Sequence, residues 1–473
     1  MPDFNHAPSW SELHDRVQDA LRTFDESGAD SPLADLFLFR RVRGTRTLSS
    51  REITNHIMLD LITRLEQEND HYGQVLYKRF VESKSMNLTA HEMSVADSTA
   101  FRWQREGIVR LAQILDEAET AARLELHRRF LSRLDLPTNS RLFGIDAHLD
   151  RLTEWVSATD MPWLILVEGM GGIGKTTVTD AFVRRAIERY LFDDFAWVSA
   201  KADQFSLAGE IHPLHMATLT PATLVEKLAR QILPPGTLPT PFVYDQGLAL
   251  VQARLAYVPS LVVVDNLETL ADLEILLPTL VALANPSKLL LTSRKSLDHL
   301  PEIFPYRLPA LEEADALALV RYEAAARNQT DLATAPDEVL RPIFETVGGN
   351  PLALRLVVGQ TTVHALPTVL EALRSAQGRS VEQLYTFIYR QAWDNLDEPT
   401  RLALLAMPLV PAEGGNLNFI GSISGLGQHV LMDALARLVR LNLIDHRRDS
   451  LQRSRYTIHS LTRTFLHEQV AKW

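Results

Sequence analysis

The chain has 473 residues, 46% of them hydrophobic and 23% charged, which excludes disorder as its main state. Its 48 Lys and Arg against 59 Asp and Glu give a net charge of −11, which excludes a uniformly basic nucleic-acid-binding surface but not a local DNA-binding module. It contains no cysteine, so disulfides, thiol catalysis and thiolate metal sites are excluded. Without a signal-peptide pattern or an apolar stretch of about 18 residues, we expect a soluble, cytoplasmic protein with no membrane contact.

The first region, residues 1–135, is predicted to be α-helical, because apolar residues recur there at three- and four-residue spacing. Near its end, at about residues 72–112, the pattern predicts two helices joined by a tight turn. The first is short and carries Leu88 and Met93. Asp97 or Ser98 is expected to cap the second helix. The side chains that the second helix is expected to bury are Phe101, Ile108 and Leu111.

This pair of helices resembles a helix-turn-helix of the sigma-factor region-4 kind. Arg and Gln read base edges and Arg and Thr hold phosphates, so one side of the second helix is a candidate DNA-binding surface. The candidate DNA-binding residues are Thr99, Arg102, Gln104 and Arg105. Residues 96–111 hold three arginines against two acids, a small excess. A helix-turn-helix kept for protein interaction or for structure is therefore the alternative.

From about 136 to 310, short apolar runs alternate with helical stretches, which is typical of a parallel sheet covered by helices on both faces. We predict an α/β P-loop nucleotide-binding domain over this range. Beyond residue 310 the pattern is helical again, with one short hairpin in residues 442–460. The strands predicted for the α/β domain are residues 163–169, 195–200, 260–266, 287–293 and 306–311.

A glycine-rich motif follows the first predicted strand: residues 169–177 read GMGGIGKTT and fit G-x-x-x-x-G-K-[ST]. Backbone N–H groups of such a loop surround phosphate oxygens, and the following helix N-terminus adds positive potential. Lys175 is expected to reach the β- and γ-phosphates, and Thr176 to bind Mg²⁺. The nucleotide-binding residues predicted here are Gly169, Gly171, Gly172, Ile173, Gly174, Lys175, Thr176 and Thr177.

Polar residues at other strand ends extend this predicted site. Asp265 ends the run LVVVD and is expected to bind Mg²⁺ together with Thr176. Asn266 stands where many P-loop ATPases have a second acid, and Glu268 is the nearest substitute. Because an amide cannot accept a proton as a carboxylate does, we predict slow hydrolysis, which suits a switch better than a motor. Arg294 is a candidate γ-phosphate sensor, with a plain surface arginine as the alternative. The candidate catalytic residues are Lys175, Asp265, Asn266 and Arg294.

The order of these motifs resembles the NB-ARC type of STAND ATPase over about residues 140–473. Plant disease-resistance proteins, the apoptotic protease-activating factor and many bacterial regulators carry this nucleotide switch. The further motifs are LFGI at 142–145, GGNPLAL at 348–354 and RYTIHSL at 455–461. The resemblance implies a small helical domain over 311–380 and a winged-helix domain over 381–473.

The resemblance also implies roles for single residues, with ADP or ATP and Mg²⁺ as the cofactors. Pro351 packs on the nucleotide, and His459 touches the β-phosphate of bound ADP and holds the domains closed. Ser460 replaces the family's aspartate after that histidine. The residues implied to cup the adenine are Phe143, Gly144 and Ile145.

The function implied is a signal-transduction switch: ADP holds a closed monomer, and ATP opens the chain and allows self-association. With the predicted helix-turn-helix in front, this favours a DNA-binding transcriptional regulator. One alternative is a bacterial NLR-like defence protein whose front domain recruits or senses a partner. A cycling AAA-type motor is the other, which Asn266 and His459 disfavour. Neither the family's repeat sensor nor a known effector domain is recognisable, so a sensor or effector partner is expected to be a separate molecule or to have been trimmed away.

Overall fold

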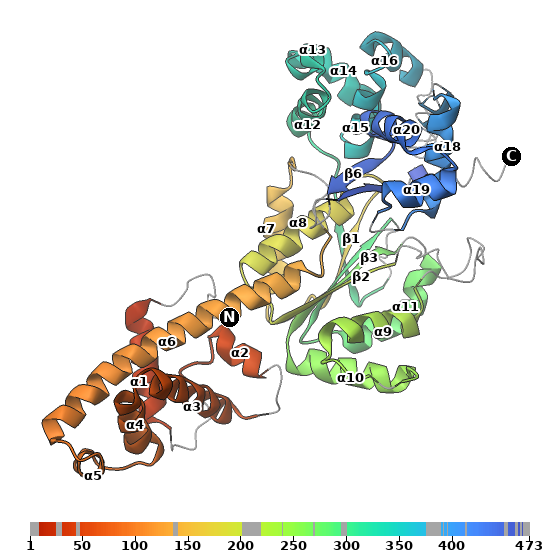
Figure 1. Ribbon diagram of the computed structural model, residues 1–473. Helices are drawn as coiled ribbons and strands as arrows, with labels where there is room; N and C mark the ends of the chain where they lie inside the picture. Colours follow the sequence, from red (N-terminus) through yellow and green to blue (C-terminus); the bar gives the residue numbers. More distant parts are fainter. Residues whose placement is uncertain are drawn as a thin grey trace. The chain divides into compact units, whose positions relative to one another are not determined.

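The chain divides into two compact units in the computed structural model (Figure 1). The first comprises Met1–Arg133 with Ala186–Asp194 and Tyr257–Pro259, and the second comprises Leu134–Arg185, Phe195–Ala256 and Ser260–Trp473. The residues that the structure describes are 9–24, 31–43, 48–135, 141–200, 219–238, 240–267, 270–294, 300–374, 389–390, 392–394, 396–411, 414–448, 453–458, 462–463 and 466.

The first unit is α-helical, as its sequence predicts, and its longest element is the 35-residue helix α6 (Asp97–Leu131). Helices α1, α3 and α4 pack along α6, and buried Leu13, Leu61 and Leu111 belong to their common hydrophobic core. The other elements described here are α1 (Trp10–Arg22), α2 (Phe37–Arg43), α3 (Ser50–Glu68), α4 (Asp70–Leu76), the π-helical turn η1 (Tyr77–Val81) and α5 (Met86–Glu92).

Two of these helices begin at the same local signal, a serine followed three residues later by a glutamate. Ser9 accepts a hydrogen bond from the backbone N–H of Glu12, and Glu12 accepts one from the backbone N–H of Ser9. Ser49 and Glu52 repeat this capping box at the start of α3. The backbone hydrogen bond from Ser49 lowers the pKa of Glu52 below its usual value. Both helix starts are therefore set by short-range sequence.

Glu119 of α6 holds the start of α2 in place. Its carboxylate accepts hydrogen bonds from the backbone N–H groups of Phe37, at 3.0 Å, and Leu38, at 2.9 Å. The Nε of Arg123 donates to the same carboxylate at 2.9 Å. Glu119 is buried, so these three donors take the place of water around its charge.

Two adjacent aspartates, Asp193 and Asp194, also lie among arginines of the first unit. Arg40 contacts Asp193 at 2.8 Å, and Arg43 donates to the same carboxylate. Arg133 donates to Asp194 at 2.9 Å. Burial lowers the pKa of Arg40, although the attraction of Asp193 acts in the opposite direction. Residues 186–194 are thus joined to the first unit by ion pairs.

The second unit contains a five-stranded sheet in the order β2-β3-β4-β1-β5, in which β1 pairs in parallel with β4 and β5, and β3 pairs in parallel with β4. Helices α9, α10 and α11 cover one face, where Leu166, Val264 and Leu291 belong to the hydrophobic core, and α7 and α8 lie on the other side (Figure 1). The strands are β1 (Leu164–Glu168), β2 (Asp194–Ser199), β3 (Ser260–Leu267), β4 (Lys288–Ser293) and β5 (Ile303–Arg307). The helices are α7 (Asp146–Ser157), α8 (Lys175–Glu188), α9 (Pro221–Ile232), α10 (Tyr244–Tyr257) and α11 (Leu270–Leu283).

The predicted strand at 306–311 is wrong by three residues at its start, because β5 begins at Ile303 and ends at Arg307. Pro305 lies inside β5 and Pro309 lies beyond its end. A proline without an N–H is tolerated in β5 because this is an edge strand that pairs with β1 alone. The proline at 305 therefore concealed the strand in the sequence pattern.

The rest of the second unit is mainly helical. Buried side chains from 316 to 466, such as Leu317, Leu354, Leu404 and Leu435, form one continuous hydrophobic core. Strands β6 (Asp445–Arg448) and β7 (Ser454–Thr457) pair antiparallel and form the predicted hairpin. The helices here are α12 (Glu313–Ala325), α13 (Thr330–Ala333), α14 (Asp337–Val347), α15 (Pro351–Gln360), α16 (Leu366–Arg374), α18 (Glu398–Ala406), η2 (Met407–Leu409), α19 (Leu417–Ser424) and α20 (Gln428–Arg440).

Among the helices described, none has both the length and the apolar character that a membrane crossing requires.

We predict that Glu119→Ala lowers the free energy of unfolding by about 2–4 kcal/mol, because it leaves two buried backbone N–H groups and Arg123 without their acceptor. Urea-induced unfolding followed by helical circular dichroism measures the change. Glu125→Ala on the same helix is the control: its carboxylate is 67% exposed and pairs with Arg41 at the surface. It should cost less than about 1 kcal/mol. Equal losses in the two variants would contradict the role of Glu119.

Candidate functional site

The sheet order brings three strand ends together. Strand β4 lies between β1 and β3, and these pairs run parallel, so the carboxyl ends of all three strands lie at one edge of the sheet. In parallel α/β sheets, ligands bind outside this edge. The glycine-rich loop follows β1, Asp265 lies near the end of β3, and Arg294 follows β4. The strand ends therefore bring the separate predicted motifs to one place.

Residues 169–174 form a turn that leads from β1 into α8, which begins at Lys175. Gly169, Gly172 and Gly174 have φ angles of 152°, 75° and 102°, which residues other than glycine rarely adopt. The Nζ of Lys175 donates to the carbonyl oxygens of Gly169, at 2.8 Å, and Met170, at 3.0 Å. The loop thus has the conformation of a phosphate-binding loop, with a lysine ammonium held against it.

Asp265 and Thr176 meet across this edge. The hydroxyl of Thr176 donates to Oδ1 of Asp265 at 2.8 Å, and the hydroxyl of Thr292 donates to the same oxygen at 2.6 Å. Asp265 is buried. A hydroxyl and a carboxylate are oxygen ligands of the kind that Mg²⁺ prefers. The residues present therefore fit a magnesium ion, which Thr176 and Asp265 would hold and which would offset phosphate charge.

Thr292 is a site residue that the sequence analysis missed. Its hydroxyl oxygen accepts a hydrogen bond from the backbone N–H of Asn266 at 2.8 Å while it donates to Asp265. Asn266 has a φ of 68°, a left-handed conformation that asparagine tolerates better than most residues. The sequence signal for Thr292 is only a polar residue that ends an apolar strand. Arg294 is half-buried beyond that strand, and Glu268 lies outside the described residues.

Glu168 is a second residue that the sequence analysis did not single out. It is the last residue of β1, immediately before the phosphate loop, and it is buried. Its Oε2 has no hydrogen-bond partner in the described part of the chain. A buried carboxylate oxygen without a donor is unusual in folded proteins, and this one lies beside the phosphate loop.

The motif at 348–354 contacts the phosphate loop directly. The backbone N–H of Leu352 donates to the carbonyl of Gly172 at 3.4 Å, and the side chain of Asn350 donates to the carbonyl of Gly171 at 3.1 Å. A Cβ added at Gly349 would lie 1.9 Å from the carbonyl oxygen of Leu311, so no side chain fits there. Pro351 begins α15 next to these contacts. The sequence analysis named Pro351 and missed Asn350.

The motif at 142–145 packs against α12. Gly144 has a φ of 62°, and a Cβ there would lie 2.7 Å from Oδ2 of Asp315. The ring of Phe143 lies 5.8 Å from that of Tyr322, between ring centroids. Ile145 immediately precedes α7. The structure thus gives Phe143 a packing role against α12, and contact of residues 143–145 with a nucleotide base stays a prediction.

Comparison with known protein families decides the identity of this domain. The NB-ARC domain family matches residues 145–330, which contain all five strands and the phosphate loop. This part of the chain is an NB-ARC domain. The predicted resemblance is therefore confirmed for these residues.

Similar proteins are found among plant disease-resistance proteins. A putative disease resistance protein of Arabidopsis thaliana is 24% identical over 129 residues, which are 26% of this chain and 14% of that protein. The probable disease resistance RPP8-like protein 2 of the same plant is 34% identical over 74 residues, 16% of this chain and 8% of that protein. The matched segments are thus about a seventh or less of these relatives' length.

Among solved structures, the chain is similar to a Signal Transduction ATPase with Numerous Domains (STAND) protein with a tetratricopeptide repeat sensor from Pyrococcus horikoshii. The two are 15% identical, with a TM-score of 0.45, over 70% of this chain and 43% of that one.

The predicted phosphate contact of the NB-ARC switch, His459, lies outside the described residues, as does Ser460. The structure does describe β7, which ends at Thr457, and Ile458, which is buried. Their hairpin partner β6 carries Asp445, which forms an ion pair with Arg355 of α15 at 3.1 Å.

In front of the NB-ARC domain, the predicted pair of helices corresponds to α5 and α6, joined by residues 93–96. Ile108 and Leu111 are buried as expected, but the expected burial of Phe101 is wrong: it is 55% exposed. The expected cap by Asp97 or Ser98 is also wrong, because Ala96 is the N-cap and makes no side-chain cap. Helix α5 packs on this first part of α6, and His71 of α4 stacks on Trp103 at 4.5 Å between ring centroids, but Phe101 stays at the surface.

The candidate DNA-binding residues lie near the start of α6. Arg102 and Arg105 are exposed, Thr99 is half-buried, and Gln104 is half-buried with an Oε1 that lacks a hydrogen-bond partner in the described part of the chain. Thr99, Arg102 and Arg105 share one helix side through their three-residue spacing, whereas Gln104 does not. The structure therefore groups three of the four on one side.

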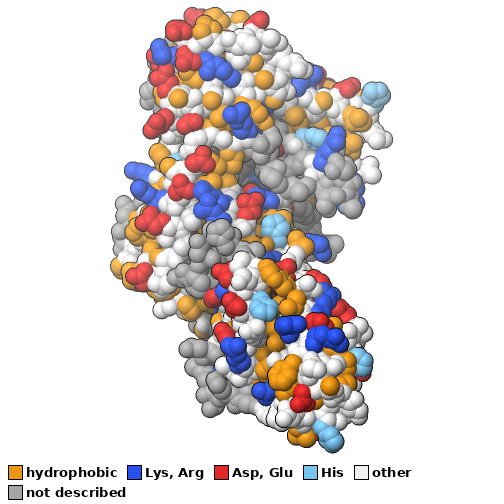
Figure 2. Space-filling model, turned by 90° about the vertical axis from the view of Figure 1, so that its left-hand side faces the viewer, with side chains coloured by type: hydrophobic (Ala, Val, Ile, Leu, Met, Phe, Trp, Pro, Cys, Tyr) orange, Lys and Arg blue, Asp and Glu red, His pale blue; other side chains and the backbone are white. Residues whose placement is uncertain are grey.

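Lysines near this helix pair are already paired with acids. Lys78 and Lys84 each contact Glu92 at 2.8 Å, and these hydrogen bonds lower the pKa of Glu92 to about 2. Figure 2 shows acidic and basic side chains interspersed over the visible face. Phosphate binding requires unpaired cations, so the electrostatic evidence for DNA contact rests on Arg102 and Arg105.

We predict that Lys175→Ala abolishes ADP binding while the fold persists, because the domain loses the ammonium that is expected to reach the phosphates. Isothermal titration with ADP should show no heat of binding, and circular dichroism should be unchanged. Arg230→Ala is the control, since Arg230 is 70% exposed on α9 and forms an ion pair with Glu226, one turn away on the same helix. Wild-type affinity in Lys175→Ala would contradict the assignment of the loop.

Proposed function

We propose that the protein is an adenine-nucleotide-dependent signalling switch. The observation that carries this proposal is the contact of the α15 N-terminus with the phosphate-loop backbone at Gly172. Asn350 follows Gly171 by 179 residues in the sequence, yet its side chain contacts the phosphate loop. A nucleotide that changes this loop therefore changes the contact, which gives ADP and ATP a way to favour different arrangements.

In this proposal, the region from 311 to 380 is the small helical domain, and the region from 381 to 473 is a winged-helix domain. Helices α18, α19 and α20 followed by the β6–β7 hairpin support that assignment. ADP stabilises the closed arrangement through His459, and ATP favours an open form that associates with further copies. Ser460, a hydroxyl in place of the family's carboxylate, weakens this closure.

Hydrolysis by this switch is slow. Lys175 orients the β- and γ-phosphates, Thr176 and Asp265 hold Mg²⁺, which offsets phosphate charge, and Arg294 senses the γ-phosphate. Asn266 takes the position of a general base, but its side-chain amide cannot accept a proton as a carboxylate does. Its backbone N–H donates to the hydroxyl of Thr292. The chain therefore keeps ATP long enough for a conformational signal to be read.

The helical front unit supplies the output. A DNA-binding transcriptional regulator would use Arg102 and Arg105, with Thr99 and Gln104 beside them. A bacterial NLR-like defence protein would instead recruit or sense a protein partner there. Exposed Phe101 and Leu88, together with lysines already paired to Glu92, favour the protein partner.

We predict that His459→Ala weakens ADP binding and increases self-association, because the closed form loses a phosphate contact from the C-terminal region. A coupling free energy of about 1–3 kcal/mol corresponds to a change of roughly 5–150-fold in the closed population. Titration calorimetry with ADP and size-exclusion chromatography with ATP measure the two effects.

The His459 prediction also tests the switch as a whole. His429→Ala is the matched control, because His429 on α20 is 96% exposed and lies near Asp433, one turn along the same helix. Full ADP affinity and an unchanged elution profile in His459→Ala would leave a plain ATPase as the better description.

We predict that, if the output is DNA, Arg102→Ala with Arg105→Ala weakens duplex binding by about 1–3 kcal/mol for each lost base contact. Fluorescence anisotropy with labelled duplex at low salt, with ADP and with ATP, is the measurement. Arg110→Ala is the control on the same helix, since Arg110 is already paired with Glu68 at 2.7 Å. No duplex binding by the wild-type chain with either nucleotide leaves the protein partner as the output.

A further inference from the structure

Asn350 uses both ends of its amide for different purposes. Its Oδ1 accepts hydrogen bonds from the backbone N–H groups of Leu352, at 3.1 Å, and Ala353, at 3.4 Å, which caps α15. Its Nδ2 donates to the carbonyl oxygen of Gly171 in the phosphate loop at 3.1 Å. Asn350 is only 4% exposed. An amide carries its acceptor and its donor on different atoms, whereas a serine or threonine hydroxyl would have to make both contacts from one oxygen.

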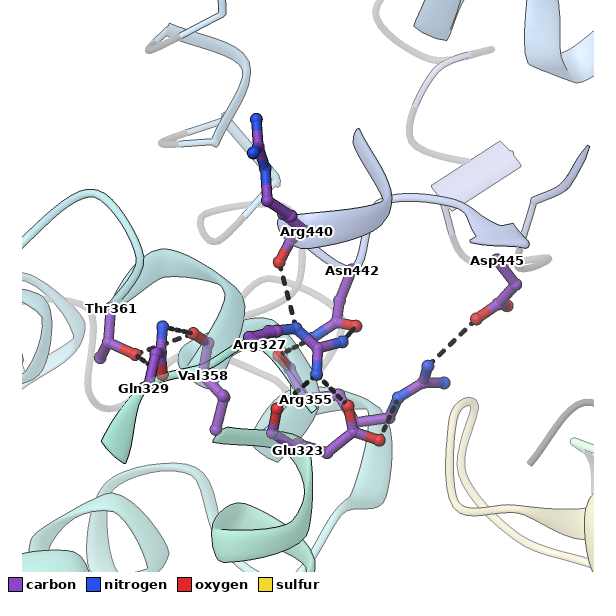
Figure 3. A network of polar contacts seen from close by, with 9 residues as sticks. All are labelled: Glu323, Arg327, Gln329, Arg355, Val358, Thr361, Arg440, Asn442 and Asp445. Atoms are coloured by element: carbon purple, nitrogen blue, oxygen red, sulfur yellow. Dashed lines mark hydrogen bonds and ion pairs between the residues drawn. The ribbon is translucent and has the colours of Figure 1, made fainter. Parts of the chain in front are cut away.

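The same helix makes charged contacts one and a half turns later. Arg355 of α15 forms an ion pair with Glu323 of α12 at 3.1 Å and another with Asp445 of β6 at 3.1 Å (Figure 3). Burial alone would lower the pKa of Arg355, but the attraction of Asp445 and Glu323 outweighs it and raises the pKa. Arg355 therefore stays charged between two carboxylates from different segments.

A second arginine completes this group. Arg327 forms an ion pair with Glu323 at 2.6 Å and donates to the carbonyl oxygen of Arg440 at 3.2 Å and to the side chain of Asn442 (Figure 3). The side chain of Asn442 in turn donates to the carbonyl oxygen of Arg355. Two arginines and two carboxylates thus balance in charge. Largely buried ion pairs add little net stability but favour one geometry, which suits a joint between segments.

The helix between these contacts is short and regular. Asn350 and Arg355 are five residues apart, which is about 7–8 Å along a helix. The described residues between them contain no glycine, and Leu352, Ala353 and Leu354 are buried in the core. Displacement of the N-terminus of α15 therefore moves Arg355 as well.

We propose that Asn350 is a positioning residue for the phosphate loop, and that α15 makes nucleotide binding depend on the ion pair between Arg355 and Asp445. This inference rests on the nucleotide binding proposed above. When the loop is held by Nδ2 of Asn350, its N–H groups keep their orientation toward the phosphates. When β6 releases Arg355, α15 loses a support and the loop is held less well.

Substitutions at position 350 separate the two roles of the amide. Asn350→Ser and Asn350→Asp both keep an oxygen that caps α15. The carboxylate has no hydrogen to donate to Gly171, and the serine hydroxyl is itself the capping oxygen on a shorter side chain, so both variants lack the separate donor nitrogen of the amide. We expect ADP to bind Asn350→Ser about 3–10-fold more weakly, the effect of one lost hydrogen bond, and Asn350→Asp still more weakly because of its charge. The melting temperature without nucleotide should stay within a few degrees of wild type, since the helix cap is kept.

Asn416→Ser is the matched control, because Asn416 caps α19 through a hydrogen bond from the N–H of Phe419 at 2.8 Å. Its ADP affinity should equal that of the wild type. Titration calorimetry on the full chain gives all four affinities. Wild-type affinity in Asn350→Ser would overturn the positioning role, whereas failure of the wild-type chain itself to bind ADP would overturn the proposed function.

The dependence on the ion pair is tested by a double-mutant cycle of Asn350→Ser and Asp445→Asn. Coupled sites should give a loss of ADP affinity in the double variant that differs at least about twofold from the product of the two single losses. If the loss in the double variant equals the product of the two single losses within error, the two contacts are independent. That result would overturn the proposed transmission through α15. If Asp445→Asn does not fold, Asp445→Glu replaces it, because it keeps the charge and displaces the carboxylate.

Discussion

The phosphate loop is a backbone structure, and its function depends on how its carbonyl groups are occupied. Lys175 holds the carbonyls of Gly169 and Met170 from within the loop. Asn350 and Leu352 hold those of Gly171 and Gly172 from a distant segment. With the carbonyls engaged, the N–H groups are left to face phosphate oxygens. The loop conformation is therefore supported partly by residues that lie far from it in the sequence.

Those parts of the fold and of the site that depend on neighbouring residues could be predicted from the sequence. The loop needs glycines at fixed positions, the buried strands read as unbroken apolar runs, and serine-glutamate pairs start α1 and α3. Such signals depend on a few neighbouring residues. For the same reason the hairpin β6–β7 could be predicted, and the NB-ARC resemblance could be based on short motifs in order.

The remaining contacts could not be predicted because their partners are far apart in the sequence. Thr292 looks like an ordinary strand-ending residue until the sheet order places it 2.6 Å from Asp265. Asn350 reads as a turn residue, and its contact with Gly171 exists only after α15 has packed. Phe101 has the spacing of a buried residue, but the core along α6 does not reach it. The spacing of apolar residues shows which side of a helix is buried, but it does not show how far along the helix the packing partners extend.

Gly349 shows how narrow the allowed sequence is at the junction between the helices and the sheet. Two backbones pass so closely there that the smallest side chain would have to occupy the space of the Leu311 carbonyl. The methyl group of an alanine at this position would push the backbone at residue 349 away from that of Leu311, although no charged group would be removed. Loss of a hydrogen bond can be compensated by water, but overlap of two backbones cannot. A single methyl group at position 349 would thus force the backbone segments around Gly349 and Leu311 apart, which makes this position intolerant of any side chain.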